Sequence, residues 1–328
     1  MKAFRTVVVP PEYPFQLQRQ DYILSIGSCF AAHIGSRLLK YKFNLLLNPF
    51  GILFNPVSIA RCLGFGLEIH KPSEMMVVRN DEMWHSMDHH GSFSSLKRED
   101  VEEKISQTNS KLHEFLQNTK LLILTFGTAY GYEFRQNKQI VANCHKMPAS
   151  FFNKKLASPK QIIHSLFGPM EKLYNINPNL KVLLSVSPVR HIRDSLIQNQ
   201  LSKSTLIISC HHLCQTFSFC HYFPAYEMLL DDLRDYRFYK VDMIHPHELA
   251  IQYVWERFQQ SLLQDKDDHL MQALDKIYQS LEHRPIHPDS TAHKLFLDKL
   301  LQQIQDLEQQ YPQLDFKEEY ALLNKGKR

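Results

Sequence analysis

Three dense apolar runs recur along the first two thirds of the chain, and a small or polar residue follows each of them. The runs cover residues 22–26, 121–126 and 181–186. A strand with one face in water alternates apolar and polar side chains, whereas a strand covered on both faces is apolar almost throughout. We therefore predict that these runs are buried strands of one mostly parallel sheet.

The segments between these strands carry apolar residues at helical spacing. This period predicts helices over residues 30–41, 56–67, 98–118, 158–176 and 201–217. Further short strands are expected within 1–20, 44–47 and 219–227, and an irregular hairpin within 75–95. Alternating strands and helices build a sheet with helices on both faces. The predicted fold class is therefore a three-layer, doubly wound α/β fold.

The pattern changes beyond residue 262, where β-branched runs stop and glutamine, aspartate, lysine and leucine dominate. Two amphipathic helices separated by a linker at 284–288 fit this stretch best. We predict an α/β domain over 1–262 and a helical extension over 263–328. Such helices can pack on the core, join two copies of the chain into a homo-oligomer, or bind another partner.

Composition narrows the function classes. The chain has 328 residues, 44% of them hydrophobic, which is enough for a full core. A net charge of +4 from 38 basic and 34 acidic residues, without a basic run, gives nucleic-acid binding no support. The apolar runs are far shorter than the roughly 20 residues that span a membrane. With no signal peptide and six scattered cysteines, we expect a cytoplasmic protein.

The stretch around the first strand carries the clearest chemistry. The strand ends at Gly27, and Ser28 and Cys29 then stand at the start of a helix. A strand-to-helix turn presents side chains and free backbone N–H groups at the carboxyl edge of a sheet, which suits a nucleophile beside an oxyanion site. The spacing alone does not choose between the two nucleophile candidates. The structural alternative is a tight turn whose small residues only allow close packing.

A second chemical segment comes late in the domain. Asp242 precedes His245 by three residues, and Pro246 begins an apolar-periodic helix. A carboxylate at this spacing can fix the imidazole tautomer and stabilise its cation while the histidine accepts the nucleophile's proton. By itself an Asp-x-x-His pair is common, but it gains weight because it follows a strand-turn-helix nucleophile.

Two histidine-containing clusters invite a metal interpretation, and we predict no metal in either. His85, His89 and His90 lack the helical i, i+4 spacing of well-attested zinc sites. Cys210 and Cys214 fit the apolar face of a helix. The loop containing His90 is instead expected to edge the cleft and contact substrate.

Several separated segments resemble one known family. Residues 26–31, Ile-Gly-Ser-Cys-Phe-Ala, resemble the motif that names the GSCFA-domain family, bacterial proteins placed with the SGNH (GDSL-like) hydrolases. Residues 141–148, 222–224 and 235–238 resemble further segments of that family. The resemblance spans roughly residues 20 to 260. It implies an SGNH-hydrolase-like, flavodoxin-like fold, no cofactor, and an acylated substrate such as a carbohydrate ester.

The resemblance also suggests residues that hold the oxyanion. In SGNH enzymes the second loop supplies a glycine N–H, which implies Gly51 here, with Asn55 as a side-chain donor. Gly127 and Thr128 follow the strand that precedes a Gly-x-Asn-Asp turn in those enzymes, but this chain has no Asn-Asp pair there. Asn143 is the expected replacement donor.

Three cationic side chains, His145, Lys146 and Arg190, are expected to bind an anionic part of the substrate. His145 stands beside Lys146, in a segment that resembles the family. Arg190 follows the third buried strand, at the edge where doubly wound sheets bind ligands, and its planar guanidinium suits a carboxylate or phosphate. The structural alternative for Arg190 is an ion pair.

We therefore expect an ester hydrolase or acyltransferase. Family precedent favours Ser28 as the nucleophile, while Cys29 falls at the nucleophile position if Gly27 is aligned with the glycine of Gly-Asp-Ser. The alternative is a binding module that keeps the cleft without catalysis, as the missing Asn-Asp pair would allow. A third hypothesis makes the C-terminal helices a scaffold for a partner.

Overall fold

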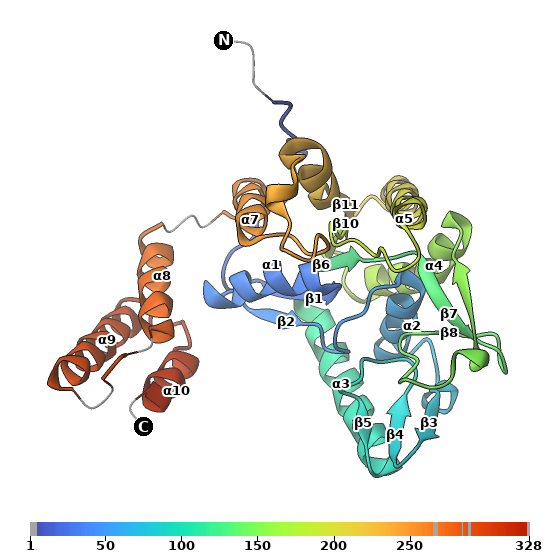
Figure 1. The fold of residues 1–328 in the computed structure, drawn as a ribbon, viewed down its shortest axis with the longest axis horizontal. Helices are drawn as coiled ribbons and strands as arrows, with labels where there is room; N and C mark the ends of the chain where they lie inside the picture. The colour runs from blue at the N-terminus through green and yellow to red at the C-terminus, as the bar shows by residue number, and fades with distance from the viewer. Residues whose placement is uncertain (1–4, 265–267, 284, 288–289, 327–328) are drawn as a thin grey trace.

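The central sheet contains five parallel strands. The computed structural model describes residues 5–264, 268–283, 285–287 and 290–326. The strands β1 (Tyr22–Gly27), β2 (Leu45–Leu47), β6 (Thr119–Phe126), β10 (Lys181–Val186) and β11 (Cys220–Phe223) lie in the order β11-β10-β6-β1-β2 (Figure 1). Counted along the chain this is the flavodoxin-like order 2-1-3-4-5. The three dense apolar runs form its three central strands, as predicted.

Helices cover both faces of this sheet, which confirms the three-layer fold. The helices α1 (Cys29–Lys40) and α7 (Glu248–Leu262) cover one face, and α2 (Pro56–Gly66), α3 (Arg98–Asn118), α4 (Pro159–Ile176) and α5 (Leu196–Thr216) cover the other. Neighbouring strand residues face opposite ways: Ile23 packs in the core beneath α1, and Leu24 packs in the core beneath α2. Both are fully buried, which explains why the runs lack polar alternation.

Two small antiparallel sheets extend the second side of the molecule. The first, β3 (Val77–Asn80), β4 (Met83–Ser86) and β5 (Ser94–Ser95), corresponds to the predicted hairpin. The second, β7 (Tyr130–Phe134), β8 (Ile140–Val141) and β9 (Phe152–Leu156), was not predicted. Within 5–20 the expected strand is only a one-residue bridge between Leu17 and Leu263, and residues 1–4 lie outside the described part.

Short helical pieces complete the domain. They are the 3₁₀-helices η1 (Pro72–Glu74), η2 (Ala149–Phe151) and η4 (Tyr236–Phe238), the short helix α6 (Ala225–Glu227) and the π-helix η3 (Met228–Leu233). None of the helices in the described ranges is long and apolar enough to cross a membrane.

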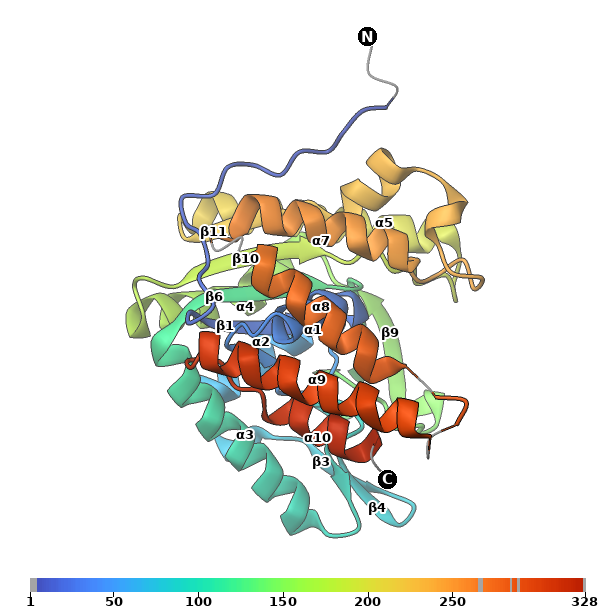
Figure 2. The ribbon, with the colours of Figure 1, turned by 90° about the vertical axis from the view of Figure 1, so that its left-hand side faces the viewer.

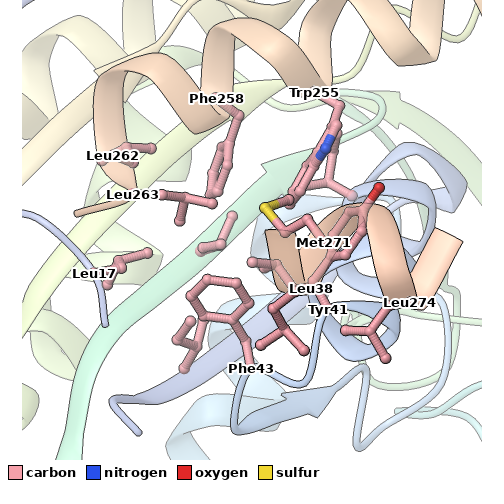
Figure 3. Close-up of a cluster of buried hydrophobic side chains, with 14 of the residues drawn as sticks. Leu17, Leu38, Tyr41, Phe43, Trp255, Phe258, Leu262, Leu263, Met271 and Leu274 are labelled. Carbon is pink, nitrogen blue, oxygen red and sulfur yellow. The ribbon is translucent and has the colours of Figure 1, made fainter. Parts of the chain in front are cut away.

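The C-terminal segment forms three helices rather than the two predicted: α8 (Asp268–Glu282), α9 (Thr291–Gln310) and α10 (Lys317–Gly326) (Figure 2). They share one hydrophobic core with α1 and α7. Figure 3 shows Met271 and Leu274 of α8 beside Tyr41 and Trp255. The extension therefore packs on the α/β domain of its own chain.

A buried ion pair reinforces this contact. Nζ of Lys42 lies 2.6 Å from a carboxylate oxygen of Glu319 in α10, and their side chains are 8% and 0% exposed. Closer to the surface, the Tyr41 hydroxyl donates to Asp275 of α8 at 3.0 Å. Buried charges are tolerated when they are paired, so the polar contacts fix where the extension docks.

Candidate active site

The turn after β1 sits at the switch point of the sheet, where strand order reverses between β1 and β6 and where folds of this order bind ligands. Gly27 N–H donates to Oδ1 of Asn48 at 2.9 Å, and Ser28 N–H donates to the Thr125 carbonyl at 3.1 Å. A Cβ on Gly27 would stand only 2.3 Å from that Thr125 carbonyl oxygen. The close approach of two strand ends explains why glycine is needed here.

The two nucleophile candidates differ in access. Ser28 is 1% exposed, and its Oγ caps α1 by accepting from the Phe30 N–H at 3.3 Å. Cys29 is the first residue of α1 and is partly exposed. Burial raises the pKa of the Cys29 thiol, and a hydrogen bond from its own backbone N–H opposes that rise. The serine is thus built into the turn, whereas the thiol is open to a reactant.

Asp242 and His245 form a preoriented pair. Nδ1 of His245 lies 2.7 Å from Oδ2 of Asp242, so the imidazole donates to the carboxylate. The other carboxylate oxygen accepts the N–H groups of Ile244 at 2.9 Å and His245 at 3.0 Å. These bonds, above all that from the His245 backbone, lower the pKa of Asp242 to about 2. Within the described residues Nε2 of His245 has no hydrogen-bond partner, which leaves it available to a ligand.

Two histidines that we did not predict as site residues surround this pair. His33 lies one helical turn after Cys29; burial lowers its pKa, Glu248 opposes this, and positive charges on Lys240, Arg37 and His245 lower it further. Charges act on each other this way only when they are close, so His245 lies in the neighbourhood of His33. The i, i+4 spacing from Cys29 to His33 was a signal that could have drawn attention to it.

His191 is the second of these histidines. Burial, followed by the charges of Lys203 and His245, lowers its pKa to about 4. Its buried Nε2 has no hydrogen-bond partner, and it would stand 3.4 Å from a Cβ placed on Gly127. The residue follows β10, so its place at the carboxyl edge could be foreseen while its role could not.

The turn after β6 is held by main-chain contacts. The amides of Gly127 and Thr128 both donate to the Phe54 carbonyl, at 2.8 and 3.1 Å. Oγ1 of Thr128 bonds to Ser202 at 3.0 Å, and Oδ1 of Asn55 caps α2 through the Val57 N–H at 2.8 Å. These groups shape the edge of the sheet, but their amides are engaged and do not point freely at a ligand.

Gly51, the expected oxyanion donor, is also engaged. Its N–H donates to the Asn48 carbonyl at 2.8 Å within a turn where Gly51 has φ +75°. A Cβ on Gly51 would stand 2.2 Å from Cβ of His90, so the exposed His90 covers this turn. The structure thus brings Gly51 and His90 together, in an arrangement that uses the glycine amide internally.

Asn143 and His145 belong to a neighbouring structural cluster. Oδ1 of Asn143 accepts the His145 N–H at 2.9 Å, and Nε2 of His145 donates to the Ser86 carbonyl at 2.7 Å. The His145 ring is 8% exposed and stacks on His85. Asn143 thus braces its own loop and His145 binds that loop to β4, and no contact of either side chain with Cys29 or His245 is found in the described part.

Arg190 holds the segment that carries Asp242 and His245. Its guanidinium carbon lies 3.9 Å from the ring centroid of Tyr239, and its backbone N–H donates to the Ile244 carbonyl at 3.2 Å. No carboxylate within the described ranges lies within salt-bridge distance. Arg190 therefore contacts an aromatic ring. The ion pair that was its structural alternative is not found among the described residues.

A buried lysine links two strand ends at this edge. Lys203 of α5 is 0% exposed, and its Nζ donates to the carbonyls of Gly127 and Ser187 at 2.6 Å each. Burial lowers its pKa to about 7. Sequence reasoning missed this residue because a lysine in a helix is usually solvated.

The fold and this edge define a flavodoxin-like α/β protein with a candidate functional site at the switch point. The model of the GSCFA family matches residues 22–258, and that of the GSCFA domain protein C-terminal domain matches residues 274–326. The chain therefore belongs to the GSCFA family. A search of curated proteins found no match to it. Within the described residues no three His, Cys, Asp or Glu side chains form a group that could hold a metal ion.

Proposed function

We propose that the protein transfers acyl groups from an ester, with Cys29 as nucleophile and His245 as general base oriented by Asp242. The observation that carries the proposal is the 2.7 Å bond between His245 and Asp242, close enough to α1 for the His245 charge to act on His33. It leaves Nε2 of the imidazole available near the helix that begins with Cys29. Family precedent favours Ser28, but its hydroxyl is buried and used as a cap, so exposure favours Cys29.

The reaction proceeds in two balanced halves. The Cys29 thiol gives its proton to Nε2 of His245 as the sulfur attacks the ester carbonyl carbon. The tetrahedral intermediate collapses, the carbon–oxygen ester bond breaks, and the imidazolium returns the proton to the leaving alcohol. A thioester remains on Cys29. Water or an acceptor hydroxyl, deprotonated by His245, then attacks the thioester carbonyl carbon. The carbon–sulfur bond breaks, the acyl group leaves as an acid or a new ester, and the imidazolium returns the proton to the Cys29 thiolate.

The first turn of α1 supplies donors for the oxyanion. In the part of the chain described, the Ala31 amide donates to no other residue, and the Cys29 amide bonds only to its own thiol sulfur, which moves off it once the sulfur has attacked the carbonyl. Free N–H groups at a helix N-terminus carry partial positive charge and stabilise a developing oxyanion. They take the role that the resemblance assigned to Gly51 and Asn143, whose polar groups are used internally.

A second function, a binding module without catalysis, is favoured by a specific observation. The amides of Gly51, Gly127 and Thr128 are all engaged in main-chain hydrogen bonds. If the α1 amides do not reach the oxyanion, the cleft can bind an ester without cleaving it. In either function we propose a cytoplasmic location, which the six free cysteines support, and a small acylated substrate such as a carbohydrate ester.

The test is formation of an acyl-enzyme. The protein is mixed with p-nitrophenyl acetate, quenched in acid, and its intact mass measured alongside Cys29→Ala, Ser28→Ala and His245→Ala. We expect an acetyl adduct that is lost in Cys29→Ala and His245→Ala and retained in Ser28→Ala. Loss in Ser28→Ala alone would reassign the nucleophile, provided circular dichroism shows an intact fold. No adduct with acetyl or longer acyl esters would favour the binding module.

A further inference from the structure

A pocket of about 390 Å³ adjoins the segment that carries the proposed base. It lies between α5, the π-helix η3 and the residues around η4. Its wall includes the side chains of Arg190, Arg234, Tyr236, Tyr239, Asp231 and Asp235. A cavity that combines aromatic walls with a few placed polar groups is typical of a small-molecule site.

Arg190 brings to this pocket a guanidinium that has no ion-pair partner among the described residues. Its Nη1 donates to the Met243 carbonyl at 3.4 Å, and it also interacts with the Tyr239 hydroxyl. The two carboxylates in the wall are paired with other arginines: Asp235 lies 3.1 Å from Arg237, and Asp231 lies 3.9 Å from Arg234, which also lines the pocket. A guanidinium with unused donors and no paired carboxylate is suited to a carboxylate or phosphate.

The aromatic residues of the pocket provide a stacking surface. Tyr236 is 62% exposed, and its ring centroid lies 5.3 Å from the guanidinium carbon of Arg190. The guanidinium carbon of Arg190 also lies 3.9 Å from the ring centroid of Tyr239. This second ring contact fixes the direction of the Arg190 donors. The Tyr239 hydroxyl is buried; burial raises its pKa, and the charge and a hydrogen bond of Arg190 oppose that rise.

Arg190 connects the pocket to the candidate active site. Arg190 binds the main chain of the loop at Met243 and Ile244, between Asp242 and His245. A ligand held by Arg190 is therefore adjacent to the turn that orients the base. Such remote contacts position a substrate for reaction.

We infer that this pocket binds an anionic group, a carboxylate or a phosphate, attached to a ring-shaped part of the substrate. Arg190 binds the anion and Tyr236 stacks on the ring. This inference rests on the proposed function for its link to acyl transfer, but binding itself needs neither nucleophile nor base. It narrows the substrate class to acyl esters that carry a negative charge.

The test measures binding without reaction. Full-length protein carrying Ser28→Ala and Cys29→Ala is titrated with benzoate, phenyl phosphate and benzamide by saturation-transfer NMR. Benzoate and phenyl phosphate separate the two anions, and benzamide is the neutral match of benzoate. We expect at least one anion to bind at least about tenfold more tightly than benzamide, as a charge-assisted pair predicts.

Variants assign the binding to the pocket. Arg190→Gln should abolish the preference for the anion, Arg190→Lys should retain part of it, and Tyr236→Ala should weaken all three ring probes. Arg193→Gln removes the same charge from an exposed position three residues away and should change nothing. Equal binding of benzoate, phenyl phosphate and benzamide, or unchanged anion affinity in Arg190→Gln, would overturn the inference. Because this protein lacks both nucleophiles, that failure is distinct from a missing acetyl adduct.

Discussion

His33 lies one helical turn after Cys29 in α1, and the charge of His245 is one of the causes that lower the pKa of His33. The relationship places a proposed nucleophile and a proposed base on elements that are more than two hundred residues apart in the chain. It also provides a way to measure their proximity without a substrate.

The pKa of His33 should report on His245. Burial is the largest cause that lowers it, and the His245 charge adds to the effect. In His245→Ala we expect the pKa of His33, followed by NMR, to rise by a few tenths of a unit because one positive neighbour is gone. His164→Ala, an exposed histidine on α4, should leave it unchanged. An unshifted His33 in both variants would argue against the placement of His245.

Asp242→Asn should slow acetyl-adduct formation by about 100-fold or more, because the amide no longer fixes the imidazole tautomer or stabilises its cation. Rates come from intact mass against time. Asp235→Asn is the matched control, since Asp235 binds Arg237 and does not touch His245. A similar loss in both variants would indicate disruption of the loop rather than loss of an orienting carboxylate.

Lys203 should make the free energy of unfolding depend on pH in the alkaline range. Its pKa is about 7 in the folded protein and near 10.4 when unfolded, so between these values the unfolded chain binds the extra proton. This contribution makes the free energy of unfolding rise with pH, by up to about 1.4 kcal/mol per pH unit. Buried thiols act in the opposite direction, because their raised pKa values favour the unfolded chain as pH rises.

The measurement therefore compares how the free energy of unfolding changes with pH in a variant and in wild type. Urea unfolding is measured at roughly pH 7.5 and 9.5, which lie between the folded and unfolded pKa values of Lys203. We expect Lys203→Met to lose stability relative to wild type as pH rises. Lys172→Met, an exposed lysine on α4, should run parallel to wild type. Parallel behaviour of Lys203→Met would mean that Lys203 is not held neutral in the fold.

Gly27→Ala should destabilise the fold by at least about 2 kcal/mol, because the new Cβ would collide with a main-chain oxygen that cannot swing aside. The distance to the Thr125 oxygen would be 2.3 Å. Gly91→Ala is the control: its Cβ would meet only the Asn143 amide at 3.7 Å, and we expect a change within about 0.5 kcal/mol. Thermal and urea unfolding of both variants make the comparison, and equal effects would contradict the packing of β1 against β6.

Lys42→Met should cost about 3–5 kcal/mol by leaving the carboxylate of Glu319 buried without its cation. Lys40→Met removes a more exposed pair with Asp275, whose side chains are 31% and 39% exposed, and should cost about 1 kcal/mol or less. Limited proteolysis of the C-terminal helices α8–α10 should accelerate only in Lys42→Met. Equal proteolysis of both would mean that the buried pair does not hold the extension.

Much of the fold could be predicted because its signals are local. The helix expected over 98–118 is observed as Arg98–Asn118, since its apolar face repeats with a single period. The second small sheet was missed because β7 pairs with β9 across an intervening loop, and pairing partners leave no period in the sequence. The third C-terminal helix, only ten residues long, follows a short turn after α9 and offers few periods to read.

The site was predictable in part for the same reason. The Asp242–His245 contact depends on three residues of spacing and is present as expected. Gly51 could be placed near the site by resemblance, but whether its amide is free depends on the Asn48 carbonyl and on turn geometry. Lys203 and His191 depend on burial, which arises only when distant strands assemble.

The shared hydrophobic core joins segments that are synthesised at very different times. Leu17 and Leu323 belong to the same hydrophobic cluster, as do the α1 residues between β1 and the second strand. On the ribosome, α1 is synthesised well before α7 and α8–α10, whose apolar residues pack in the same cluster. The nascent chain therefore leaves this apolar face of α1 uncovered until those helices have also been made.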